Sequence, residues 1–208
     1  MNDLEALAAQ LLDKASERFK DLSGTDPDEK TVKALADKEA PLEARQDAVR
    51  GWLHHYRVLR GIRAEKIDRI AKAVVEYADG ARPESLGLDQ EVIAEQFHAL
   101  GARLAVVVGK RNTISMASKA LWLCYPDAVP IFDDYAERAL QILCRIQGIA
   151  VRAQVVGTYE RFLNAWLQVH AACLPALDAV PLVTYPYRIR LLDWLLWYLG
   201  EPRFDDLP

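Results

Sequence analysis

The spacing of apolar residues is the feature that most restricts how this chain can fold. In the segments Leu4–Leu22 and Ile93–Val107, apolar side chains recur every three or four residues, which is the period of one buried helix face. The segment 149–156 alternates loosely, and because no partner strand is visible we expect a loop or a helix entry there. The sequence therefore predicts an all-α fold, either one irregular multi-helix bundle or two helical lobes with a cleft between them.

Glycine and proline mark where the expected helices end. Gly61 and Gly148 offer C-terminal stops, and Pro175 is expected to end the helix that contains Trp166. The run Asp26-Pro27-Asp28-Glu29 supplies an N-cap, a first-turn proline and a capping-box glutamate. The expected helices run over about 3–22, 26–36, 41–60, 67–79, 89–108, 113–124, 135–147, 159–174 and 191–199.

Chain length bears on the domain organisation. The 208 residues suffice for one substantial core, or for two small lobes that share an interface. We expect a single globular helical domain over residues 1–208. The segment Gly80–Gly87 contains two glycines and a proline, so a boundary between lobes is expected near 80–89.

The distribution of apolar residues and cysteines indicates the compartment. Apolar side chains are spread along the chain rather than gathered in one span of membrane length, and Met1–Glu5 does not open a signal peptide. We therefore expect no membrane partner and a cytoplasmic location. Cys124, Cys144 and Cys173 have no metal-binding spacing and lie in apolar helical surroundings, so we expect reduced thiols in the core.

Metal and cofactor sites have no support in the sequence. His54 and His55 are adjacent and diverge on a helix, whereas His98 and His170 stand alone. The chain contains no glycine-rich phosphate loop, no dinucleotide-binding fingerprint and no G-x-S-x-G motif. We expect no metal and no cofactor, and neither nucleotide hydrolysis nor hydride transfer is indicated.

Basic residues gather in two places although the net charge is −4. The two clusters are Arg57, Arg60, Arg63 and Lys66, and then Lys110 and Arg111. Each cluster taken alone is more typical of a solvated helix face than of a binding site. An acidic protein can still bind nucleic acid through a local basic patch, so DNA stays a partner to test.

One lysine and one aspartate are the strongest candidates for chemistry. Lys119 lies on an expected helix of small and apolar residues, and an amine in such surroundings gains nucleophilic character because its charged form is disfavoured. Asp133 follows the turn Pro126–Pro130 and opens the next helix, where a carboxylate can orient water or stabilise a developing cation.

The same residues also have a structural interpretation. Asp134 with Glu137 fits a capping box, and Asp133 can serve as a cap itself. Lys119 can pair with these carboxylates across the turn. On the residues alone, the catalytic and the structural interpretations both stay open.

The pattern Ser118-Lys119-x-Leu121 … Tyr125-Pro126-Asp127-x-x-Pro130-Ile131-x-Asp133 resembles a motif of bacterial helical proteins that are distantly similar to the helix-hairpin-helix DNA glycosylases. In that superfamily a lysine is followed by a proline-flanked turn, an aspartate, and an arginine five residues on. These positions are matched by Lys119, Pro130, Asp133 and Arg138. Two superfamily glycines whose amides approach a DNA phosphate are replaced here by Ser115 and Ala117.

The resemblance implies a DNA-base glycosylase-like protein that acts on DNA, or that binds it with reduced or no catalytic activity. In members with lyase activity the lysine attacks the sugar carbon, and the aspartate supports departure of a damaged base, which assigns these roles to Lys119 and Asp133. The substrate-binding residues expected with them are Lys110, Arg111, Ser115, Ser118 and Arg138.

A non-catalytic helical interaction or scaffold protein is the alternative function. In that case the motif residues only fix the geometry of the turn. The last expected helix carries Trp194 and Trp197 among leucines, which is more typical of a core helix than of a dimer interface. The oligomeric state stays open between monomer and homodimer.

Overall fold

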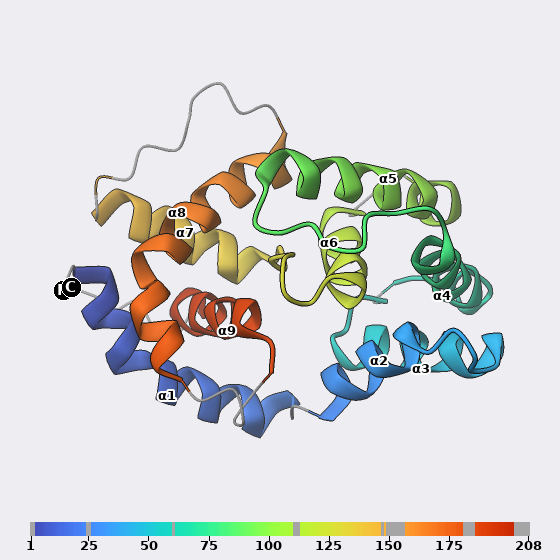
Figure 1. The fold of residues 1–208 in the computed structure, drawn as a ribbon, viewed down its shortest axis with the longest axis horizontal. Coiled ribbons are helices and arrows are strands. Elements are labelled where there is room, and N and C mark those ends of the chain that lie inside the picture. The colour runs from blue at the N-terminus through green and yellow to red at the C-terminus, as the bar shows by residue number, and fades with distance from the viewer. Residues whose placement is uncertain are drawn as a thin grey trace. The chain divides into compact units, whose positions relative to one another are not determined.

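The helices of this chain form two compact groups. The computed structural model describes residues 3–23, 26–59, 61–109, 113–146, 148, 157–180 and 186–201 (Figure 1). In these residues it has nine α-helices and no β-strand, which confirms the all-α class. We call Ser23–Val129 the continuous unit, and Met1–Leu22 with Pro130–Pro208 the discontinuous unit. The segment 80–89, where a boundary between lobes is predicted, lies inside the continuous unit. The segment 149–156, where a loop or a helix entry is predicted, lies outside the described residues.

The described helices of the continuous unit pack in a closed series. They are α2 (Asp26–Ala36), α3 (Leu42–His55), α4 (Ala64–Asp79), α5 (Gln90–Val108) and α6 (Thr113–Cys124). Each packs against the next, and α6 returns to contact α2 (Figure 1). The rings of Trp52 and Trp122 stack with centroids 5.7 Å apart, and both side chains are fully buried. The core of this unit therefore includes α6, the helix that carries Lys119.

Helix α3 ends earlier than the sequence predicts. The prediction extends it to Gly61, but the helix ends at His55. Arg57 adopts the left-handed conformation with φ of 55°, and the Val58 amide donates to the Leu53 carbonyl at 3.0 Å. This is the hydrogen-bond pattern of a Schellman end, in which glycine usually takes the left-handed position. Because arginine occupies it here, the residue types do not signal the helix end.

Both ends of α5 are set by residues that suit them. The Asp89 carboxylate accepts hydrogen bonds from the Glu91 and Val92 amides at 2.9 and 3.1 Å, which satisfies two N–H groups of the first turn. At the other end Gly109 has φ of 83° and ψ of 177°, a region that residues with a Cβ rarely adopt. The chain therefore leaves α5 directly after Val108.

Helix α9 is the central element of the discontinuous unit. The described helices of this unit are α1 (Asp3–Ser23), α7 (Asp134–Ile146), α8 (Thr158–Ala179) and α9 (Arg188–Gly200). Helix α9 packs against both α7 and α8. Trp194 is 1% exposed, which confirms that it is a core residue. A Cβ on Gly200 would lie 1.9 Å from the Tyr135 carbonyl oxygen, so only glycine permits this approach of α9 to α7.

Helix α8 does not stop at its proline, and the predicted end is wrong. The helix continues through Pro175 to Ala179. Ala176 and Leu177 in the added turn are buried, and this burial offsets the amide hydrogen bond that the proline cannot make. The Arg188 guanidinium donates to the Leu177 carbonyl at 2.5 Å and so caps the extended end.

Cys124, Cys144 and Cys173 all lie among the described residues, and none of them forms a disulfide bond. Cys144 and Cys173 are buried, and Cys124 is half-buried at the end of α6. Burial raises the pKa of Cys124 to about 12 and that of Cys173 to about 11, so both thiols stay protonated at neutral pH. Protonated thiols are poor nucleophiles, which fits a role in packing.

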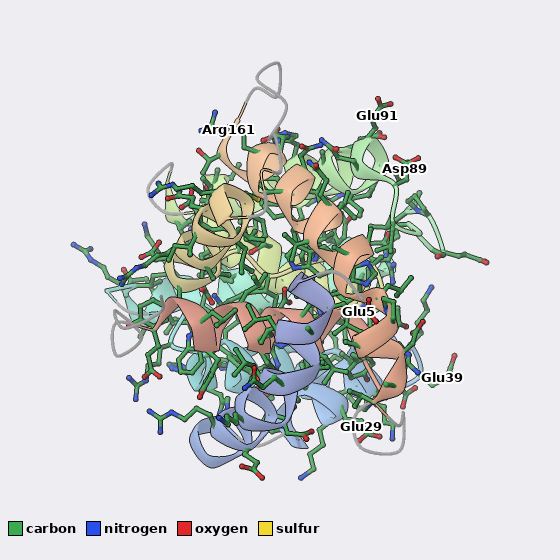
Figure 2. All side chains as sticks on the ribbon, turned by 90° about the vertical axis from the view of Figure 1, so that its left-hand side faces the viewer. Glu5, Glu29, Glu39, Asp89, Glu91 and Arg161 are labelled. Atoms are coloured by element: carbon green, nitrogen blue, oxygen red, sulfur yellow. The ribbon has the colours of Figure 1, made fainter. Side chains whose placement is uncertain are left out.

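Several acidic side chains project from the surface near the ends of helices. Figure 2 shows Glu39, Asp89 and Glu91 pointing away from the ribbon. All three are exposed. Among the helices that the structure describes, none combines the length and the apolar character that crossing a membrane requires.

Candidate functional site

Lys119 is held along its own helix. It is 8% exposed, and its Nζ donates a hydrogen bond to the Ser115 Oγ one turn earlier at 2.9 Å. The Ser118 hydroxyl donates to the Ser115 carbonyl at 3.1 Å. The structure thus brings together three residues that the sequence analysis selected, and these hydrogen bonds lie within α6.

Asp133 is the N-cap of α7. Its Oδ1 accepts the Ala136 amide at 2.8 Å, and its backbone carbonyl accepts the Glu137 amide at 2.9 Å. The cap is therefore Asp133, and Asp134, predicted to open a capping box, is the first residue of the helix. A carboxylate at this position satisfies an otherwise unpaired N–H and interacts favourably with the helix dipole. Asp133 thus has a clear structural role.

The residues selected from the motif belong to different units. Lys119 lies in the continuous unit, whereas Asp133 and the exposed Arg138 lie in the discontinuous unit. Lys110 and Arg111 lie outside the described residues.

A buried carboxylate that the sequence analysis did not select anchors the turn before α7. Asp193 of α9 is 3% exposed, and it accepts the Ile131 amide at 3.1 Å and the Trp166 Nε1–H at 3.0 Å. The Arg190 guanidinium lies 3.7 Å away. Burial raises the pKa of Asp193 to about 7, against the lowering effect of Arg190 and of the two N–H donors. Asp193 thereby joins three segments of the discontinuous unit.

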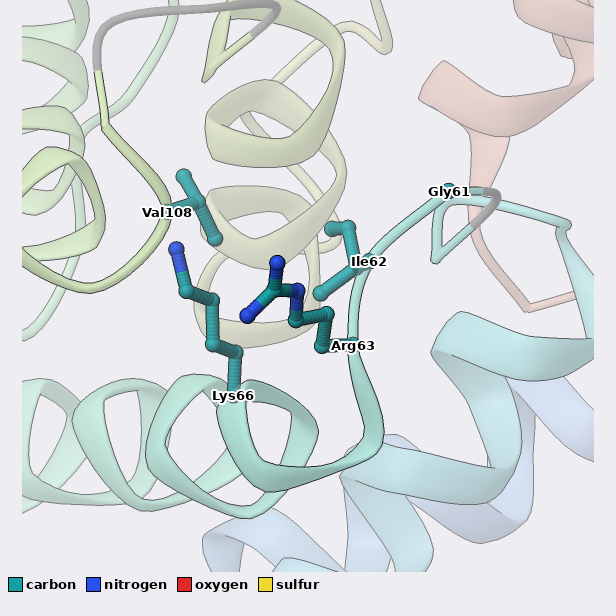
Figure 3. Close-up of a pocket in the computed structure, with 5 residues that line it drawn as sticks. All are labelled: Gly61, Ile62, Arg63, Lys66 and Val108. Carbon is teal, nitrogen blue, oxygen red and sulfur yellow. The ribbon is translucent and has the colours of Figure 1, made fainter.

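A basic surface runs along α4 and α5, which contact each other. We call it the α4–α5 basic surface and define it by Arg63, Lys66, Arg69, Lys72 and Arg103. Its first hollow has a volume of about 150 Å³ and is lined by Gly61, Ile62, Arg63, Lys66 and Val108. Figure 3 shows the Arg63 and Lys66 side chains extending toward Val108 into the same space. Two cations from the start of α4 thus face the end of α5.

A second, larger hollow follows along the same two helices. It has a volume of about 410 Å³ and is lined by Arg69, Lys72, Ala73, Glu76, Arg103, Val106 and Val107. Glu76 is the one carboxylate among the residues that line the two hollows. The side chain of Val106 is 80% exposed. This hollow is therefore lined by both cationic and apolar side chains.

The cations of this surface are poorly neutralised. Within the part of the chain that the structure describes, Lys66, Arg69 and Arg103 form no ion pair with a carboxylate. Arg63 lies 3.8 Å from Glu65 and Lys72 lies 3.7 Å from Glu76, but all four side chains are more than half exposed, and such pairs contribute little. The positive charge is therefore available to a ligand.

The sequence predicts some residues of the α4–α5 basic surface but not all of them. Arg63 and Lys66 belong to the first basic cluster, and Arg69 and Lys72 continue its spacing of three residues. Arg103 gives no signal, because it stands alone on α5 and joins the surface only through the packing of α5 on α4. The same three-residue spacing, extended past Lys66, predicts Arg69 and Lys72 as members of the surface.

Neither a metal-binding cluster among the described residues nor a similar known protein identifies the kind of site. Among the described residues, no group of three histidine, cysteine, aspartate or glutamate side chains is placed to hold a metal ion. No protein-family model, curated protein or solved structure matches the chain. The fold and the α4–α5 basic surface together define a class, a helical protein with a basic, partly apolar surface.

Proposed function

We propose that this chain is a DNA-binding helical protein that contacts the phosphate backbone through the α4–α5 basic surface and does not itself release bases. The observation that carries the proposal is the composition of this surface. Five cations from two packed helices surround hollows that contain one carboxylate, Glu76. Such a local excess of positive charge is the usual footprint of a phosphate-binding face.

The release of counterions from DNA would favour binding to the α4–α5 basic surface. A cation that replaces a condensed counterion on DNA releases that ion into solution, which favours binding and makes it salt-dependent. Lys66, Arg69 and Arg103 can do this without breaking an ion pair to a described carboxylate. The net charge of −4 opposes binding only weakly, because salt screens charges beyond about 8–10 Å.

The motif supports DNA over other polyanions. The segment Ser118–Asp133 resembles proteins related to DNA glycosylases. A non-catalytic role is supported by the local bonds of the two key residues, since Lys119 donates to Ser115 and Asp133 caps α7. These two hydrogen bonds give a structural reason for a lysine at position 119 and an aspartate at position 133, so neither residue needs a catalytic role.

Glycosylase activity is the second candidate. One observation favours it, which is that Lys119 is 8% exposed and its Nζ donates a hydrogen bond to the Ser115 hydroxyl. A desolvated and positioned amine is what a nucleophilic lysine requires. The two candidates differ in whether DNA is altered, so they can be separated by experiment.

The first test measures how salt affects binding. We expect the full chain to bind a fluorescent DNA duplex with an affinity that falls steeply between roughly 50 and 200 mM salt. The triple variant Lys66→Gln, Arg69→Gln, Arg103→Gln should bind at least tenfold more weakly. Its slope of log affinity against log salt should be smaller by about 1 for each cation that contacts a phosphate.

A charge-matched variant serves as the control. Lys14→Gln, Lys33→Gln, Lys38→Gln removes the same charge from exposed positions on α1, on α2 and just after α2. It should bind nearly as well as the unmodified chain. An equal loss in both variants, or no binding by the unmodified chain, would contradict the proposal.

The second test looks for chemistry. The protein is incubated with duplexes that carry damaged bases, with and without borohydride, and released bases and trapped adducts are measured. We expect neither product. An adduct that disappears in a folded Lys119→Met variant would instead establish the second candidate.

A further inference from the structure

We propose that the second hollow of the α4–α5 basic surface holds an unpaired base of a DNA strand, while phosphates on either side of that base lie against Arg69 and Arg103. This inference rests on the proposed function and specifies the form of DNA that the surface prefers. The hollow is the one lined by α4 residues Arg69–Glu76 and by Arg103, Val106 and Val107 of α5.

The apolar residues that line the hollow are not needed for phosphate binding. Ala73, Val106 and Val107 line it, and Val106 is 80% exposed although it is a large apolar residue. The hollow is open to solvent and has a volume of about 410 Å³. A ligand that covered these apolar side chains would remove apolar surface from water and gain free energy.

The bases of a duplex cannot supply that apolar contact. Their faces are stacked on one another, so a duplex would place charged backbone over Val106. An unpaired base exposes its apolar face, and its N–H edge is no longer used in pairing. Glu76, which also lines the hollow, can accept a hydrogen bond from that edge. The mixture of groups in the hollow therefore fits an unpaired nucleotide better than a paired one.

Arg103 is held ready for a phosphate. Its guanidinium carbon lies 5.8 Å from the centre of the Tyr77 ring, within reach of a cation–π interaction. Tyr77 is 4% exposed, and its hydroxyl donates to Gln96 Oε1 at 2.7 Å. A fixed ring thus orients the cation before DNA arrives, which lowers the entropic cost of binding.

The test compares two labelled DNA strands of equal length and equal phosphate number. One is an oligothymidine, and the other carries abasic sites in place of all its bases. We expect the full chain to bind the thymidine strand more tightly than both the abasic strand and a duplex. Val106→Ser should weaken binding to the thymidine strand roughly fivefold and leave the abasic strand unaffected.

Two further variants distinguish the contribution of the DNA bases to binding from that of the phosphate backbone. Arg103→Gln should weaken binding to both strands, because both present phosphates. Leu174→Ser, which alters an apolar residue that is 40% exposed on α8, should change neither affinity. Because Val106 and Leu174 are exposed, neither serine variant should lose its fold.

Failure of this inference differs from failure of the proposed function. Equal, salt-dependent binding of the two strands, no effect of Val106→Ser, or preference for the duplex would overturn the inference and leave DNA binding intact. No binding of any DNA would overturn both.

Discussion

At the scale of single residues, Gly200 sets the distance between two helices. Its Cα is so near the first turn of α7 that a Cβ would overlap the Tyr135 carbonyl. That atom belongs to the backbone, so it cannot move aside by changing a rotamer. Gly51, within α3, has nothing within 4 Å of an added Cβ. The two glycines therefore allow a matched comparison.

We expect Gly200→Ala to lower the free energy of unfolding by about 1–3 kcal/mol, because overpacking forces the backbone to shift. Gly51→Ala should raise it by about 0.5–1 kcal/mol, because alanine loses less backbone entropy in a helix. Urea denaturation of both variants measures the difference. Similar stabilities for the two variants would show that α9 and α7 are less closely packed than described.

Single residues also show how far the sequence could predict the site. Lys119 and Asp133 stand out because of their types and spacing, and Arg63 and Lys66 because they cluster. Arg103 does not, since its neighbours in the surface come from another helix. A functional residue whose partners are distant in sequence leaves no local signal. Whether Lys119 and Asp133 act in catalysis stays a prediction.

At the scale of elements, the apolar period predicts where helices lie better than where they end. The predicted ends of α3 and α8 are wrong, and each error has a specific physical cause. Helix α3 ends at an arginine in the left-handed conformation, a position where glycine is the usual marker. Helix α8 passes Pro175 because the burial of Leu177 outweighs one missing hydrogen bond. Both outcomes depend on tertiary packing and hydrogen bonds that the residue types do not show.

Asp193 makes the packing of α8, α9 and the turn before α7 depend on pH. Its pKa is raised by burial from 3.8 to about 7, so between these values the folded state keeps a proton that the unfolded chain has lost. The free energy of unfolding should therefore fall as pH rises from about 4 to 7, by at most about 1.4 kcal/mol per pH unit. Outside this window Asp193 should add no slope.

Urea denaturation between pH 4 and 8 tests this expectation. Asp193→Asn cannot ionise, so the stability of this variant relative to the unmodified chain should increase with pH across the window. Asp134→Asn, at an exposed position of α7, is the control and should leave the profile unchanged. Parallel profiles for the unmodified chain and Asp193→Asn would contradict the role assigned to burial.

At the scale of the whole molecule, the proposed interface lies entirely within the continuous unit. Every residue that lines the two hollows lies between Gly61 and Val108. This unit has its own core, which includes the stacked Trp52 and Trp122. The unit is also a single stretch of chain, Ser23–Val129, so it can be expressed without a new linker.

We expect a fragment of residues 23–129 to be helical and to unfold cooperatively. It should bind the DNA duplex with the same salt dependence as the full chain, because it retains all the cations of the α4–α5 basic surface. Circular dichroism and fluorescence anisotropy measure these properties. A folded fragment that fails to bind would show that the discontinuous unit contributes to the interface.

The discontinuous unit is built from two separate stretches of the chain, and this affects how it can fold during protein synthesis. Residues of α1, such as Leu11 and Leu12, are buried, and Arg18 bonds to Glu201 at a separation of 183 residues. A ribosome makes α1 before the continuous unit, but it makes Glu201 and the rest of Pro130–Pro208 after that unit. The apolar side of α1 must therefore wait, exposed to solvent or to chaperones, while the continuous unit is made and can fold. Helix α1 thus reaches its final place only after the segment Pro130–Pro208 has been made.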